Sequence, residues 1–249
     1  MKAYKTNLIL IFLLLGISPW AFSASAEMSS KHLRLVKDLM NNNLAYSQDA
    51  TTTNIIEWEE EIVDSLRQKK DYRNMFLMKQ MAVYAYSLQA KISEALKKAD
   101  AMMDEARLMK YNIGISLSYQ ALGDIYLNAG MRPEAVEEYE KAMKTLQATP
   151  HAEKIQERIF IQLVPTLIKL KRMDEAKAYL EHMSEICESK CLSPFLLYAY
   201  HAYYYLRNND LSKAREYIDE AIKINSRTPS HFYDNILKLS LIHISEPTR

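Results

Sequence analysis

The chain has 249 residues, 25% of them charged and 49% hydrophobic, which is enough for one or two globular units. It contains only 4 Gly and 7 Pro, which leaves little turn chemistry for a many-stranded sheet and favours an all-helical protein. A formal net charge of +1, with both signs mixed along the chain, gives no electrostatic signature of nucleic-acid binding.

Residues 1–26 are predicted to be a cleavable signal peptide. A basic start precedes an apolar run over residues 8–17, and Ala24 and Ala26 supply the small residues of a cleavage site. This run is far shorter than the roughly 20 residues that a membrane-spanning helix needs, which favours cleavage over an uncleaved anchor. The mature protein is therefore expected in the periplasm or outside the cell.

Residues 27–71 are predicted to form two N-terminal capping helices, a degenerate repeat that shields the end of the fold. The first is the amphipathic stretch over residues 29–40, and the second carries an apolar stripe. Asn54 with Glu57 resembles a capping box, and residues 41–54 are expected to be a flexible loop. The apolar stripe consists of Ile55, Trp58, Ile62 and Leu66.

A helical hairpin is predicted over residues 116–150, "SLSYQALGDIYLNAGMRPEAVEEYEKAMKTLQATP". Its first helix places three large apolar groups and Gly123 on one face, and Gly130 lies in the turn that follows. Pro133 suits the first turn of the second helix, where its missing N–H costs nothing. Ala135, Tyr139 and Ala142 then share one face of that helix, so that small residues allow close approach and Tyr139 fills the space between the helices.

This unit resembles a tetratricopeptide repeat, and its pattern recurs along the chain. The resemblance implies an all-α fold, a right-handed solenoid of about four helical hairpins over residues 72–230. The spacing exceeds the 34 residues usual for the family, which predicts lengthened helices. Pro165 lies inside a first helix and is expected to kink it. Equivalent alanines recur at intervals of 40, 41 and 38 residues, at Ala95, Ala135, Ala176 and Ala214.

Residues 231–238 are interpreted as the truncated first helix of a further repeat. The next stretch, residues 239–249 ("LSLIHISEPTR"), resembles a translated sequencing adapter, and the alternative is a natural hydrophobic tail. We therefore expect the chain to be the N-terminal part of a longer protein.

No catalytic motif is present, and no metal site or cofactor is predicted from these residues. The visible chain is therefore interpreted as non-enzymatic, although a missing C-terminal part could be a kinase. Cys187 and Cys191 are the candidates for a disulfide in an exported protein, with a reduced pair or metal binding as the alternatives.

A groove along the first helices is the candidate binding site implied by the resemblance. Its mixture of amide, acidic, cationic and aromatic side chains suits a peptide, a protein segment or a small polar ligand, although an ordinary solvated surface has the same composition. The aromatic run over residues 198–207 is explained mainly by core packing, and His201 by packing or by a place in the groove. The candidate groove residues are Gln80, Tyr84, Gln120, Asp124, Asn128, Arg158, Lys169, Tyr203 and Arg207.

Two functions are compatible with these observations. The stretch over residues 108–131 is similar to the periplasmic tetratricopeptide-repeat domains of membrane-bound histidine kinases and related regulators. The first function is accordingly the extracytoplasmic sensor part of such a signalling protein, attached to a membrane only through a missing C-terminal region. The alternative is a standalone exported scaffold that binds partner proteins.

Overall fold

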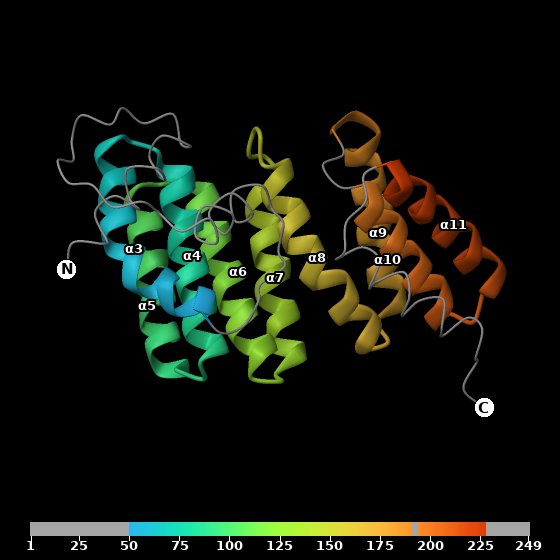
Figure 1. Ribbon diagram of the computed structural model, residues 1–249, viewed down its shortest axis with the longest axis horizontal. Coiled ribbons are helices and arrows are strands. Elements are labelled where there is room, and N and C mark those ends of the chain that lie inside the picture. The colour runs from blue at the N-terminus through green and yellow to red at the C-terminus, as the bar shows by residue number, and fades with distance from the viewer. Residues whose placement is uncertain (1–49, 191–193, 228–249) are drawn as a thin grey trace. The chain divides into compact units, whose positions relative to one another are not determined.

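The fold is built from α-helices. A computed structural model describes residues 50–190 and 194–227, and the regular structure in these ranges is helical throughout. From Thr52 onward, the described helices, labelled in Figure 1, belong to one compact unit. The predicted all-helical fold is confirmed for this part of the chain. The helices are α3 (Ala50–Gln68), α4 (Tyr72–Leu88), α5 (Ile92–Leu108), α6 (Asn112–Asn128), α7 (Arg132–Leu146), α8 (Glu153–Lys169), α9 (Met173–Lys190), α10 (Pro194–Arg207) and α11 (Leu211–Arg227).

Consecutive helices pair into hairpins, and each hairpin packs against the next. The pairs are α4 with α5, α6 with α7, α8 with α9, and α10 with α11. Both helices of the first pair contact α6, α7 contacts α8, and α8 and α9 both contact α10. This repeated arrangement is the helical solenoid that the sequence pattern predicts.

The turns explain why the repeat is longer than usual. The helices α4, α5 and α6 each have 17 residues and are joined by three-residue turns, which makes a hairpin of about 40 residues. In most of these turns one residue adopts a positive φ, and its own amide and the amide of the next residue close a Schellman motif. At Ala90 (φ 58°), for example, the Ala90 N–H donates to Ser87 O and the Lys91 N–H to Tyr86 O, both at 3.0 Å.

Only one of the described turns uses glycine at the left-handed position. Gly130 has φ 82°, whereas Lys70, Lys110 and Lys171 adopt φ values of 51–61° despite their side chains. A Cβ makes this backbone region unfavourable, so each of these residues stores some strain. The left-handed conformation of these residues is therefore determined by the packing of the two helices that the turn connects, and not by a local preference of the residue for this conformation.

Ala90→Gly is therefore expected to raise the free energy of unfolding by about 0.5–1 kcal/mol, because glycine relieves the left-handed strain. The matched control is Ala101→Gly on the exposed surface of α5, where the same change should lower stability by about 0.5–1 kcal/mol. Urea unfolding of both variants measures the difference. Destabilisation by both substitutions to a similar extent would contradict the interpretation of the turn.

The alanines that recur in the second helices are core residues. Ala95, Ala135, Ala176 and Ala214 are each 0% exposed, which confirms their predicted role in close packing. Each of these alanines lies five residues after the left-handed residue of its hairpin. The distance in sequence from the turn to the core alanine is therefore the same in all four hairpins. Their small side chains let the two helices of a hairpin approach each other.

The N-terminal helix α3 confirms one prediction and corrects another. Its apolar stripe, which includes Trp58, is buried as predicted. However, the helix already includes Ala50, so Asn54 lies inside it and cannot be the N-cap of a capping box. The part of the expected loop from residue 50 onward is likewise helical. Residues 29–40, the signal peptide and residues 228–249 lie outside the described residues.

Pro165 lies within the described span of α8, and its local hydrogen bonding is compensated from another helix. Because proline has no N–H, it cannot donate to the carbonyl of Ile161, four residues earlier. That carbonyl instead accepts a hydrogen bond from the Tyr200 hydroxyl of α10 at 3.2 Å. The Tyr200 hydroxyl thus provides a polar link between the third and fourth hairpins, and the kink at Pro165 stays a prediction.

Candidate functional site

The predicted groove residues fall into two groups in the structure. Tyr84 and Tyr203 are half-buried, while Asn128, Lys169 and Arg207 are exposed. The other four are almost completely buried, with 3–4% of their surface exposed. These buried residues are Gln80, Gln120, Asp124 and Arg158.

Three of the buried residues form a hydrogen-bonded network with Tyr139. The Gln80 amide donates to Asp124 Oδ2 at 2.7 Å, and the Tyr139 hydroxyl donates to Asp124 Oδ1 at 2.7 Å. On the other side, Arg158 Nη2 donates to the Gln80 Oε1 atom at 3.0 Å. The network joins α4, α6, α7 and α8, and therefore links three successive hairpins.

Burial changes the expected behaviour of Asp124. The sequence predicts that charge reversal at this position alters partner binding without affecting helicity. Because the carboxyl group is 3% exposed and accepts two internal hydrogen bonds, reversing its charge would bury an unmatched cation and destabilise the fold. Arg207 is exposed, so the same expectation still stands there.

Burial also raises the pKa of Asp124 to about 6 from its ordinary value of 3.8. The Tyr139 hydroxyl, the Arg158 guanidinium and the Gln80 amide each favour the charged carboxylate but only partly offset the desolvation. The pKa of the Tyr139 hydroxyl is also raised, well above its usual range, by burial and by the adjacent Asp124. The network therefore contains a carboxyl group that titrates in a mildly acidic range.

Asn128 connects the first two hairpins nearer the surface. Its amide donates to Ser87 Oγ at 2.7 Å, while the Ser87 hydroxyl donates to the carbonyl of Tyr84 at 2.8 Å. Within the described ranges, the Gln120 Oε1 atom is buried without a hydrogen-bond partner. The predicted groove residues thus serve partly to hold the hairpins together and partly to form an accessible surface.

A cluster of aromatic rings occupies the fourth hairpin. Tyr217 of α11 stacks on His201 with 4.6 Å between ring centroids and on Tyr205 with 5.4 Å, and Tyr198 is tilted against it at 6.1 Å. The predicted packing of Tyr198 and Tyr205 is observed, but both rings remain half-buried and partly accessible. His201 is also a packing residue, and burial lowers its pKa to about 4 although Glu181 acts in the opposite direction.

Sequence reasoning missed Tyr217. The first two hairpins carry charged residues at the equivalent position, Lys98 and Glu138, and the third carries Tyr179. The position of Tyr217 could have been recognised from the sequence. It is a tyrosine on the second helix of the hairpin, at a spacing that places it beside the aromatic residues of the preceding helix.

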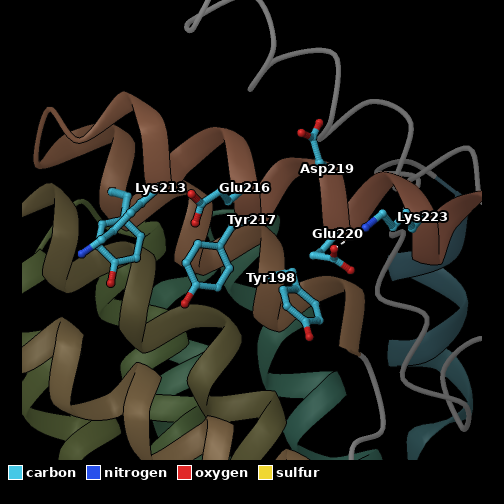
Figure 2. A pocket seen from close by; sticks show the side chains of 8 residues that line it. Tyr198, Lys213, Glu216, Tyr217, Asp219, Glu220 and Lys223 are labelled. Carbon is cyan, nitrogen blue, oxygen red and sulfur yellow. Dashed lines mark hydrogen bonds and ion pairs between the residues drawn. The ribbon is translucent and has the colours of Figure 1, made fainter.

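An open pocket of about 540 Å³ lies beside this cluster. Among the described residues, it is lined by Tyr198, Tyr205 and Tyr217 and by charged side chains of α11 that include Glu216 and Glu220. Figure 2 shows the rings of Tyr198 and Tyr217 on the same side of α11, whereas Asp219 points away from them. This pocket combines apolar ring surface with carboxylates.

The comparisons with known proteins identify the hairpin type. The family described as tetratricopeptide repeat matches residues 117–145 and 197–228, which are the second and fourth hairpins. Two of the hairpins therefore match the tetratricopeptide-repeat model. No curated protein matches the sequence. The matches support a protein-interaction module, since tetratricopeptide repeats commonly bind protein partners.

The second hairpin, formed by α6 and α7, shows why its sequence pattern takes this form. A Cβ atom added to Gly123 would lie 2.5 Å from Tyr139 Cε1, so glycine is required where α6 meets this ring. Tyr139 is 0% exposed, and its hydroxyl reaches Asp124. The sequence predicts that Tyr139 fills the space between the two helices, whereas its close contact with Gly123 and its hydrogen bond to Asp124 were not predicted.

Metal and disulfide chemistry have no further support in the structure. No group of three or more His, Cys, Asp and Glu side chains arranged to hold a metal ion occurs among the residues described. The side chain of Cys187 and the whole of Cys191 lie outside the described residues. The disulfide between them therefore stays a prediction.

Proposed function

We propose that the chain is a non-enzymatic interaction module that binds a protein or peptide partner along the first helices of its hairpins. The observation that carries this proposal is the pair of tetratricopeptide repeats at residues 117–145 and 197–228. The partly accessible side chains of Tyr84, Tyr203 and Arg207 supply aromatic and cationic contacts on these first helices. Such contacts suit an extended segment of another protein.

The predicted export signal and the resemblance to sensor domains extend this proposal. We infer that the module lies outside the cytoplasm and forms the sensing part of a membrane signalling protein of the two-component type. The support is the basic and apolar start of the chain and the similarity of residues 108–131 to such domains. Among the described helices, none is long and apolar enough to cross a membrane.

Site-specific photocrosslinking tests the module in a host that exports it. A photoreactive phenylalanine analogue at Tyr84 or Tyr203 should yield adducts with a partner protein or peptide, because both positions lie on first helices. The matched control is Tyr179, a half-buried tyrosine on the second helix α9. Mass spectrometry of the same material should show a mature chain that begins at Glu27.

Two results would contradict the proposal in different ways. Equal crosslinking at Tyr179, or none at Tyr84 and Tyr203, would remove the partner surface on the first helices. A chain that retains residues 1–26 and stays in the cytoplasm would remove the extracytoplasmic role while leaving the binding module intact.

A further inference from the structure

The aromatic pocket of the fourth hairpin lies apart from the proposed groove. On α10, Tyr198 and Tyr205 are seven residues apart and share one side, whereas Tyr203 lies two residues before Tyr205 and projects from the opposite side. We propose that this pocket is a second binding site, in which Tyr198, Tyr217 and Glu216 hold a lysine or arginine side chain of a partner protein.

The rings provide a surface suited to a cation. Tyr198 and Tyr217 both line the pocket, with their centroids 6.1 Å apart and their planes inclined by 41°. The negative face of a tyrosine ring attracts an ammonium or guanidinium group within about 6 Å of the centroid. A long cationic side chain that lies in the pocket across the accessible parts of both rings can place its apolar stem on one ring and its charge against the other.

The protein uses this type of contact within its own repeats. The Lys213 ammonium lies 5.1 Å from the centroid of Tyr205, at the edge of the same pocket. In the first hairpin Lys98 lies 5.5 Å from Tyr86, which is equivalent to Tyr205. A lysine over a tyrosine ring thus recurs on this side of the hairpins.

The charges in the pocket favour a cation over an anion. Lys213 forms an ion pair with Asp210 at 3.8 Å, and Lys223 forms one with Glu220, so the two lysines already face carboxylates. Within residues 50–190 and 194–227, no ion pair is found for Glu216, and its side chain lies next to Tyr217. The Glu216 carboxylate is therefore available to an incoming cation, beside the rings that would receive it.

The second hairpin offers a matched control. Glu137 is equivalent to Glu216 and is also exposed, but the following residue is Glu138, where the fourth hairpin has Tyr217. A carboxylate is thus present in both hairpins, whereas the ring beside it is present only in the fourth. A ligand attracted by carboxylates alone would respond to both positions, and a ligand held in the pocket would respond only to Glu216.

Fluorescence anisotropy with the full chain tests the site. The probe is a fluorescein-labelled Gly/Ser peptide that contains arginines, and the comparison peptide replaces each arginine with its neutral isostere citrulline. Citrulline is expected to weaken binding roughly fivefold or more, and Glu216→Gln to weaken binding of the arginine peptide to a similar extent. Tyr217→Leu should have the same effect, and Glu137→Gln should change the affinity by less than about twofold.

The proposal is overturned if the arginine peptide does not bind, if citrulline binds equally well, or if Glu137→Gln and Glu216→Gln weaken binding equally. Glu216 is exposed, so its variant tests the site even if Tyr217→Leu perturbs folding, which circular dichroism would reveal. Crosslinking from Tyr84 and Tyr203 should be unchanged in Glu216→Gln. A negative result in the peptide-binding assay therefore does not contradict the proposed groove. A negative result in the crosslinking experiment likewise does not contradict the proposed pocket.

Discussion

Gly123→Val is expected to lower the free energy of unfolding by about 3 kcal/mol, because it forces extra atoms into a filled interface. A Cβ at this position would lie 2.5 Å from Tyr139 Cε1 and 2.7 Å from Cδ1. The ring cannot swing aside cheaply, since it is fully buried and its hydroxyl donates to Asp124. Urea unfolding of the variant against the unsubstituted chain measures the loss.

A compensating substitution makes this prediction specific to the contact. The position equivalent to Gly123 is Val164 in the third hairpin, where the partner equivalent to Tyr139 is Leu180. Both Val164 and Leu180 are buried, so this valine and leucine pair fits the same type of interface. Gly123→Val combined with Tyr139→Leu should therefore be more stable than Gly123→Val alone.

The double substitution also separates steric from conformational effects. Ala101→Val on the exposed surface of α5 controls for the lower helix propensity of valine, which is expected to cost less than about 1 kcal/mol. Additive losses in the double variant, or a Gly123→Val variant no less stable than the Ala101→Val control, would contradict the close contact between α6 and α7.

The repeat could be predicted from sequence because its signals are local. The alanines and Gly123 recur at fixed distances from each turn, and helix periodicity alone places them on one face. The exact start of α3 was not predictable in this way. Asn54 and Glu57 have the spacing of a capping box, yet the helix includes the residues before them, so this local signal does not set the start of the helix.

The buried network could not be derived from local patterns. Gln80 bonds to Asp124, which is 44 residues away, and to Arg158, which is 78 residues away. The family resemblance placed each residue on a first helix one at a time, and it contained no information on whether their side chains meet. Their pairing depends on how three hairpins stack, which is a tertiary property. Four of the nine predicted groove residues could therefore be located correctly on their helices and still be assigned too much exposure.

The charge of Asp124 is expected to make stability depend on pH. Its pKa is raised to about 6 in the folded chain, chiefly by burial, whereas the unfolded chain releases this proton near pH 3.8. Between these values the folded state binds more protons than the unfolded state, so the contribution of this group to stability falls as the pH rises. The loss begins near pH 4 and is complete above about pH 6, and it amounts to about 3 kcal/mol.

Asp124→Asn isolates this contribution because asparagine does not titrate. The free energy of unfolding of the unsubstituted chain minus that of the variant should decrease by about 3 kcal/mol between pH 4 and pH 7, as measured by urea unfolding at each pH. Tyr139→Phe removes a hydroxyl that donates to the carboxylate and lowers the pKa of Asp124, so it should raise this pKa and extend the decrease to higher pH. A difference that is constant with pH, or that grows as the pH rises, would show that the Asp124 carboxyl does not keep its proton in the folded chain. Since this carboxyl accepts hydrogen bonds from Gln80 and Tyr139, its protonation state bears directly on the contacts that join the first three hairpins.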